Sequence, residues 1–367
     1  MNFEHVCIES FGYTLPQTVV TSEDIEARLS PLYQRLKLRP GRLELMTGIA
    51  ERRFWPTGTR VSDISVVSCQ SALQAADLDP TRVGLLVHGS VCRDHLEPAT
   101  ACRVHHIVGL PAECVIYDVS NACLGIINGM LQAANMIELG QIEAALVVGS
   151  ENGRGLVDTT IDALNHNQTL TRKSIKSSFA SLTIGAASCA VLLTHESISK
   201  TQTHLTHAVC RAHTKFHDLC QSLSDQAGGG MQPLMETDSE TLMLQGVETG
   251  RLTLEGYLAQ SGWTRDEIQH TFNHQVGGAH RTLTLEILKL DPERDFVTFS
   301  ELGNTGSAAL PVTIARAIEE NRLQPGDHAL LLGIGSGINC MMAGVEWQTC
   351  PVKGREQDTF VDVATAV

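Results

Sequence analysis

The segment DVSNACLGIINGM, residues 118–130, joins two regular elements through a single cysteine. An apolar run ends at Tyr117 and predicts a strand, whereas the residues from Leu124 to Gly140 are apolar nearly all round and predict a buried helix. Small polar residues between the two predict a tight turn that carries Cys123. Because strands and buried helices that alternate in this way form α/β proteins, the segment favours an α/β fold.

The same segment makes Cys123 a candidate nucleophile. The buried helix would point the positive end of its dipole at the sulfur, so we expect the pKa of the thiol to be lowered and a reactive thiolate to form. The alternative is that Cys123 is one more small buried residue, as most of the cysteines are. Its position directly before the helix favours the nucleophile.

Two pairs of segments repeat along the chain at nearly the same offset. Segment 142–153 is similar to segment 326–337, a shift of 184 residues (326 − 142), because each is a β-rich run that ends in glycine. Segment 81–90 is similar to segment 266–275, a shift of 185 residues (266 − 81). The agreement predicts two halves of similar topology that meet near residue 190.

We therefore expect two α/β halves, residues 1–190 and 191–350, followed by a tail at 351–367. Sites in α/β folds lie at the carboxyl ends of strands, so the glycine-rich loops of both halves should converge on one cleft. The insert at 151–185 is polar and without clear periodicity, and we expect a long loop that caps the pocket. A second cap is expected at 205–240, which contains the glycine run QAGGGMQP, residues 226–233.

The composition of the 367 residues is that of a globular enzyme, with 43% hydrophobic and 19% charged residues. A formal net charge of −14 argues against nucleic acid as a partner. Eleven cysteines without a Cys-x-x-Cys pair favour a reducing compartment over a disulfide framework. We find neither a signal peptide nor an apolar run of membrane-spanning length, and we expect a soluble, cytoplasmic protein.

Basic residues gather near the N-terminus despite the acidic balance. Arg39 and Arg42 lie in RLKLRPGR, and Arg53 lies in ERR. Arginines at the mouth of a tunnel would bind the phosphates of coenzyme A or of a carrier's phosphopantetheine. The alternative is an ordinary solvated face.

Two further residues join Cys123 as catalytic candidates. His274 stands at the end of a predicted strand, and Asn304 lies in a glycine-rich loop that enters a helix. The repeat places Ser307 where Cys123 stands in the first half (307 − 123 = 184), so the loops of Cys123 and Asn304 should face each other. The order Cys, His, Asn also describes a papain-like cysteine hydrolase, although the papain-type flanking sequence is absent around Cys123.

Five ordered motifs carry a resemblance that spans nearly the whole chain. They are TGIAERRF (47–54), DVSNACLGIINGM (118–130), NHQVGGAH (273–280), GNTGSAALP (303–311) and LLLGIGSGINCMMAGVEW (330–347). Together they resemble the β-ketoacyl-ACP synthase III branch of the thiolase superfamily. The resemblance implies a five-layer αβαβα fold of two similar halves, and a homodimer.

The resemblance also implies roles for the candidates. Cys123 would accept an acyl group from acyl-CoA, while backbone amides at Cys123 and Ser336 would stabilise the oxyanion. His274 and Asn304 would hold the thioester carbonyl of the second substrate as it becomes an enolate. The reaction would need no metal and no permanently bound cofactor, only coenzyme A thioesters and, for one route, acyl carrier protein.

The type of condensation stays open at this point. Synthase III enzymes form their enolate by decarboxylating malonyl-ACP, as in fatty-acid biosynthesis. The related condensing enzymes of the long-chain olefin pathway join two acyl-CoA chains and use a glutamate of the partner subunit, 26 residues before the nucleophile, as the base. Glu97 has that position here (123 − 97 = 26), within GSVCRDHLEPATA. A third alternative is a non-catalytic dimer subunit, against which the presence of Cys123, His274 and Asn304 argues.

A histidine-rich segment offers a last candidate site. His207, Cys210, His213 and His217 have helical spacing, and zinc accepts such ligands. The spacing fits no standard zinc signature, so we expect an amphipathic cap helix here and no metal.

Overall fold

The computed structural model describes residues 1–222 and 234–358 of the chain. Most strands join one mixed sheet in the order β11-β12-β13-β8-β1-β7-β6-β4-β5, with β14 paired to β1. The strands of the first half are β1 (Val6–Leu15), β4 (Val83–Gly89), β5 (Val115–Val119), β6 (Ala144–Asn152) and β7 (Ala186–His195). Those of the second half are β8 (His204–Ala212), β11 (His270–Asn273), β12 (His328–Gly335) and β13 (Asn339–Glu346).

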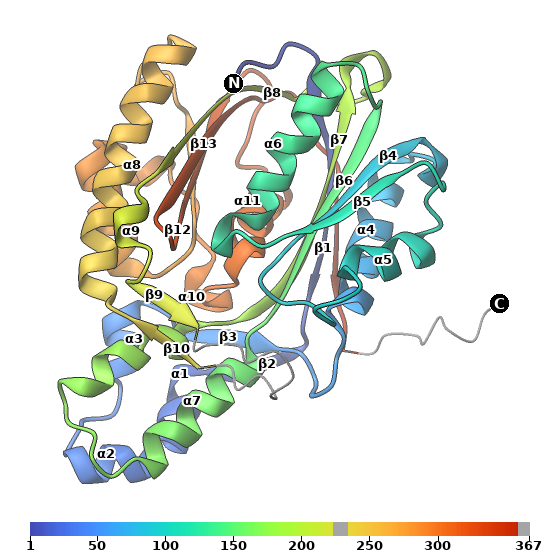
Figure 1. The fold of residues 1–367 in the computed structure, drawn as a ribbon. Coiled ribbons are helices and arrows are strands. Elements are labelled where there is room, and N and C mark those ends of the chain that lie inside the picture. The colour runs from blue at the N-terminus through green and yellow to red at the C-terminus, as the bar shows by residue number, and fades with distance from the viewer. Residues whose placement is uncertain (223–233, 359–367) are drawn as a thin grey trace.

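Five layers are visible in Figure 1, in which two helices lie between the two parts of the sheet. These central helices are α6 (Gly125–Glu138) and α11 (Ala309–Glu319). The outer layers are α4 (Val61–Ala76) with α5 (Thr100–Val108) and α8 (Ser239–Ser261) with α9 (Gly278–Leu288). This arrangement confirms the predicted αβαβα fold of two similar halves.

The two halves repeat the same strand order. The first half runs β5-β4-β6-β7-β1 and the second runs β11-β12-β13-β8, with a parallel bridge from Thr271 to Asp295 where β4 pairs with β5 in the first half. A bridge between Cys7 and His204 joins the halves through β1 and β8. The predicted boundary near residue 190 falls within β7, which pairs with β1 and β6.

Close packing around α6 fixes where the helix begins. A Cβ on Gly125 would lie 2.5 Å from the carbonyl oxygen of Gly89 at the end of β4, so only glycine allows this approach. Farther along, α6 buries Ile126, Met130 and Leu131 in the core between the sheet layers. The start of α6, and with it Cys123, is thereby held at the carboxyl end of β4.

Two sequence predictions about local structure, for the insert and for the histidine-rich segment, are wrong. The insert at 151–185 is not a structureless loop, because α7 (Arg154–His166) buries Val157, Ile161 and Leu164 against the hydrophobic cluster of the N-terminal helices. In the histidine-rich segment, His207 and Cys210 lie on strand β8 and not on a helix, because β8 pairs with β13 along its whole length, and His213 and His217 follow the strand. The tail begins with β14 (Val352–Glu356), which pairs in parallel with β1.

The remaining elements surround this core. They are β2 (Thr18–Thr21), α1 (Ser22–Arg28), α2 (Ser30–Leu36), α3 (Arg42–Thr47), β3 (Glu51–Phe54), β9 (Cys220–Ser222), β10 (Met235–Thr237) and α10 (Phe299–Leu302), with short 3₁₀ turns between them. None of the described helices is long and apolar enough to cross a membrane. The glycine run at 226–233, predicted as a cap, and residues 359–367 lie outside the described part of the chain.

Candidate active site

The turn between β5 and α6 is fixed on both sides of Cys123. A 3₁₀ turn covers Ala122–Leu124, and Ala122 has a φ of 46°, a left-handed conformation that is costly for a residue with a side chain. The Nδ2 atom of Asn339 donates to Asn121 Oδ1 at 3.1 Å, and Asn121 Nδ2 donates to Asn128 Oδ1 at 3.1 Å. Strain held by such contacts is typical of functional turns.

The thiol of Cys123 is neutral in the substrate-free protein. Burial, with smaller contributions from the negative charge of Glu151 and from the nearby Cys220, raises its pKa to about 12. The expected lowering of the pKa by the α6 dipole is therefore wrong for this state, because desolvation of the sulfur outweighs the dipole. The thiol must lose its proton while the acyl group is transferred.

Beside Cys123 lies the end of β12. A Cβ built on Gly335 would be 3.8 Å from the backbone nitrogen of Cys123 and 3.0 Å from Cγ of Leu124. Ser336 follows directly and is half-buried. Because Gly335 has no side chain, the end of β12 can approach the turn of Cys123 this closely, and the predicted oxyanion hole at Cys123 and Ser336 stays a prediction.

His274 follows directly on β11 and is buried. Its backbone nitrogen donates to Leu332 of β12 at 2.9 Å, and the side chain of Gln275 braces the loop by donating to Asn273 and accepting from Thr298. Burial and the neighbouring His280 lower the pKa of His274 to about 3. The imidazole is thus neutral at pH 7 and can donate one hydrogen bond without carrying a charge.

Asn304 is buried and oriented by its own loop. Its backbone nitrogen donates to Thr183 at 2.9 Å, its carbonyl accepts from Gly185, and its Oδ1 accepts from the backbone of Gly306 at 3.0 Å. Since Oδ1 is occupied in this way, Nδ2 is the side-chain atom left to donate to a ligand.

The two turns predicted to face each other are in contact. The turn Ala122–Leu124 touches the turn Gly306–Ala308, which follows Asn304, and it also touches β12, to which His274 is hydrogen-bonded. The turns of Cys123 and Asn304 therefore adjoin each other, and His274 is linked to the Cys123 turn through β12.

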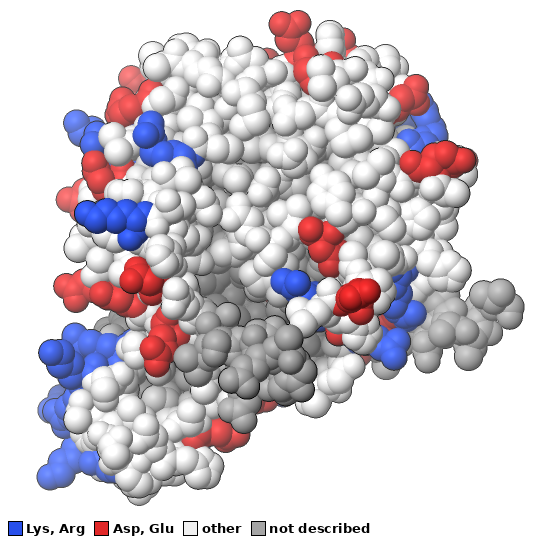
Figure 2. All heavy atoms as spheres, in the orientation of Figure 1, with Lys and Arg blue, Asp and Glu red and all other residues white. Residues whose placement is uncertain are grey.

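The other predicted residues lie elsewhere on the chain. Glu97 is exposed on the loop between β4 and α5, without a hydrogen bond or ion pair to the described residues. Arg53 forms an ion pair with Glu356 at 3.0 Å. Arg39 and Arg42 are exposed, and Figure 2 shows Lys and Arg side chains gathered over α2 and α3, the helices beside them.

Glu151 is a residue of the site that was not predicted from the sequence. Glu151, at the end of β6, is 3% exposed, and its Oε1 accepts from Ser307 Oγ at 2.5 Å, from the backbone of Ser307 at 3.3 Å and from the backbone of Val91 at 3.4 Å. The repeat contained the signal, since Glu151 is the counterpart of Gly335 (335 − 184 = 151).

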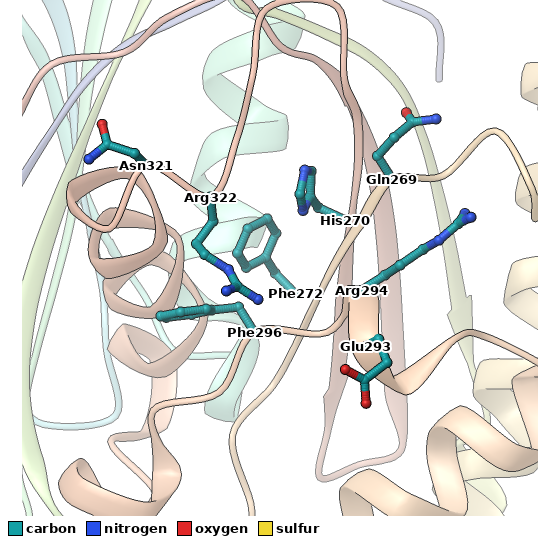
Figure 3. Close-up of a pocket in the computed structure, with 8 residues that line it drawn as sticks. All are labelled: Gln269, His270, Phe272, Glu293, Arg294, Phe296, Asn321 and Arg322. Atoms are coloured by element: carbon teal, nitrogen blue, oxygen red, sulfur yellow. The ribbon is translucent and has the colours of Figure 1, made fainter.

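A cleft at the opposite end of β11 is separate from this site. Figure 3 shows His270, Phe272, Arg294 and Arg322 around it, at the start of the strand that His274 follows. The charged groups there are largely engaged, because His270 pairs with Asp327 at 2.8 Å and Arg294 donates to two backbone carbonyls. Residues 1–222 and 234–358 contain no group of three or more potential metal ligands, and the histidines of β8 form no such cluster.

Comparison with known families gives the same result as the fold. Residues 258–347 match the C-terminal domain of 3-oxoacyl-[acyl-carrier-protein] synthase III, residues 117–213 match the same synthase, and residues 45–154 match the N-terminal domain of thiolase. The chain belongs to the 3-oxoacyl-ACP synthase III-like family of thiolase-fold condensing enzymes. It is an acyltransferase, and this membership excludes the papain-like alternative.

Within this family, the chain is more similar to some relatives than to others. It is 41% identical to an acyl-CoA:acyl-CoA alkyltransferase of Shewanella oneidensis, over 95% of this chain and all of the relative. It is 33% identical to an enzyme of the same name from Xanthomonas campestris, over 95% of this chain and all of the relative. It is 26% identical to a β-ketoacyl-ACP synthase III of Roseiflexus castenholzii, over 93% of this chain and 97% of the relative.

Solved structures show the same similarity as the sequences of these relatives. Crystal structures of Xanthomonas campestris OleA superpose with a TM-score of 0.89 at 32% identity, covering 95% of this chain and 98% of OleA. That protein has been solved with substitutions of a cysteine, a glutamate and a histidine. Its substituted glutamate precedes its substituted cysteine by 26 residues, which is the spacing of Glu97 and Cys123 here.

Proposed function

We propose that this protein joins two acyl-CoA thioesters by a non-decarboxylative Claisen condensation, with Cys123 as nucleophile and Glu97 as base. The observation that carries the proposal is the 26-residue spacing of Glu97 and Cys123, shared with the two residues substituted in Xanthomonas campestris OleA. The greater similarity to acyl-CoA:acyl-CoA alkyltransferases than to synthase III supports it.

The first step transfers an acyl group to the enzyme. The Cys123 sulfur attacks the thioester carbonyl of acyl-CoA, the bond from that carbonyl to the coenzyme A sulfur breaks, and the thiol proton goes to the departing coenzyme A. Backbone amides at Cys123 and Ser336 receive the negative oxygen of the tetrahedral intermediate. Arg39, Arg42 and Arg53 are the proposed contacts for coenzyme A phosphates.

The second step forms the carbon–carbon bond. Glu97 removes a proton from the α-carbon of a second acyl-CoA, and neutral His274 and the Asn304 amide donate to the enolate oxygen. The α-carbon attacks the acyl carbonyl on Cys123, the carbon–sulfur bond to Cys123 breaks, and the proton held by Glu97 returns to that sulfur. The product is a 3-oxoacyl thioester, and no metal or resident cofactor takes part.

The base is proposed to come from the partner subunit of a homodimer. Glu97 is exposed, and its neighbours Leu96 and Val91 leave 62% and 50% of their surface exposed. Strand β5 is an edge of the sheet, and Val115 on it is 46% exposed. An open edge strand beside exposed apolar side chains is a surface that a second copy would cover.

The alternative is decarboxylative condensation with malonyl-ACP, which the synthase III domain matches favour. Product analysis with long-chain acyl-CoA alone, and with acyl-CoA plus malonyl-ACP, separates the two. We expect a 3-oxo product from acyl-CoA alone that is lost in Glu97→Gln. Product formation only when malonyl-ACP is present would overturn the proposal.

Mixed dimers test where the base comes from. When Cys123→Ala and Glu97→Gln subunits are co-expressed with different tags and the heterodimer is isolated, one site combines an intact Cys123 with an intact Glu97 of the other subunit. We expect about half of wild-type activity per heterodimer. The matched control pairs a doubly substituted subunit with a wild-type one and should be inactive. The reverse pattern would place Glu97 in the site of its own subunit.

A further inference from the structure

Glu151 is a buried carboxylate in the centre of the candidate site, and the proposed mechanism gives it no role. It forms no ion pair with the described residues, so its charge depends on hydrogen bonds. Oγ and the backbone nitrogen of Ser307 supply two of these, and the backbone of Val91 supplies a third. The Cys92 thiol also hydrogen-bonds the carboxylate.

The repeat shows what this position corresponds to. The turns before α6 and α11 match residue by residue at a shift of 184, so that Ala122 corresponds to Gly306 and Cys123 to Ser307. Both turns begin in the left-handed region, with φ values of 46° and 55°. The same shift relates Glu151 at the end of β6 to Gly335 at the end of β12.

The two strand ends meet the opposite turns in the same way. Gly335 lies next to the backbone nitrogen of Cys123 and has no side chain to place beside it. Glu151 lies next to Ser307, and a Cβ on Gly306 would be 3.2 Å from its Oε1. Where the first half has a glycine beside the turn, the second half has a negative oxygen of the protein.

We propose that Glu151 is a positioning residue whose carboxylate fills the second half's counterpart of the oxyanion hole and holds the Asn304 turn in place for carbon–carbon bond formation. The proposal rests on the proposed function, because it assumes that Asn304 binds the enolate. Asn304 is only three residues before Ser307, so the Glu151–Ser307 contacts fix the end of the loop that carries it. The contact to Val91 ties the loop of Glu97 to the same carboxylate.

Glu151 is better suited to this role than to that of the base. Its Oε1 accepts hydrogen bonds from Ser307 and Val91, so those lone pairs are not available to remove a substrate proton. Its negative charge is also one cause of the raised pKa of Cys123, together with burial and Cys220. The other titratable groups facing Glu151 are Cys92 and His88.

The test separates the two chemical steps in Glu151→Gln and Ser307→Ala. We expect acylation of Cys123, followed by intact-protein mass, to stay within about threefold of wild type. Condensation should fall about tenfold or more, in kcat more than in KM, because a charged hydrogen bond that orients a reacting group is lost. Glu143→Gln, an exposed carboxylate just before β6, is the matched control and should leave both steps unchanged.

A second readout distinguishes positioning from a general loss of structure. The pH profile of Cys123 alkylation by iodoacetamide should shift to lower pH in Glu151→Gln, because a negative charge near the sulfur is removed, and should stay in place in Ser307→Ala. If Glu151→Gln does not fold, Ser307→Ala alone decides, through its condensation rate. Condensation within twofold of wild type would overturn the inference while leaving the proposed function intact, whereas no acylation of wild-type Cys123 would overturn both.

Discussion

The turn before α6 and the turn before α11 share a backbone but differ in chemistry. Each is a 3₁₀ turn that begins with a left-handed residue and enters a buried central helix, yet one carries a thiol beside Gly335 and the other a hydroxyl beside Glu151. A duplicated scaffold offers the same strand-end site twice. In this chain one copy has a glycine beside the turn and the other is occupied by the carboxylate of Glu151, which is the basis for the proposal that the second copy positions residues and the first reacts.

The comparison predicts that the first half carries out acylation and that the second half supplies the donors for condensation. His274→Ala and Asn304→Ala should each slow condensation about 10²–10³-fold, because a donor to the enolate oxygen is lost. Both variants should still form the acyl-Cys123 adduct, measured by intact-protein mass, since the first step uses the other turn. If acylation and condensation slow equally in these variants, the two halves do not have these separate roles.

A side chain added at Gly335 should slow the acylation of Cys123. A Cβ on Gly335 would lie 3.0 Å from Leu124 and 3.8 Å from the Cys123 nitrogen, so Gly335→Ala should slow acylation about tenfold by narrowing the space for the oxyanion. Stopped-flow release of coenzyme A measures this. Gly256→Ala, in helix α8 with only an ordinary 3.6 Å contact, is the control and should acylate like wild type. An unchanged acylation rate in Gly335→Ala would show that the oxyanion hole does not lie at this position.

The buried His274 and the half-buried His280 predict a modest dependence of stability on pH. Burial lowers the pKa of His274 to about 3 and of His280 to about 4, from an ordinary 6.5. Below pH 6.5 the unfolded chain therefore binds protons that the folded chain does not, and stability falls as the pH falls toward 4. Between pH 7 and pH 5, the free energy of unfolding should fall by about 1 kcal/mol less in His280→Gln than in wild type, as measured by urea denaturation. A variant of the exposed His95 is the control. If the free energy of unfolding falls with pH as steeply in His280→Gln as in that control, the prediction is contradicted.

The sequence predicted the parts of the site that depend on local pattern. The strand, turn and helix around Cys123 and the repeat that pairs it with Ser307 follow from apolar periodicity and glycine placement, and the structure confirms these elements. Features set by tertiary contacts were missed. His207, Cys210, His213 and His217 have helical spacing, yet segment 204–212 becomes a strand through pairing with β13. Helix α7 depends on packing against α2 and its neighbours.

The pKa of Cys123 was predicted in the wrong direction for the same reason. A helix dipole can be read from the sequence, whereas the burial of the sulfur and the approach of Glu151 exist only in the folded chain. Glu151 itself has no local pattern that distinguishes it from an ordinary carboxylate at the end of a strand. Only its partners, Ser307 and Val91, show its place in the site.

The most direct measurement locates the acyl group after the protein is incubated with one equivalent of long-chain acyl-CoA and digested for peptide mass spectrometry. We predict an acyl mass on the peptide that contains Cys123, none on the peptides of the other ten cysteines or of Ser307, and no adduct in Cys123→Ala. An acyl group on a different residue, or an adduct that survives in Cys123→Ala, would contradict the account.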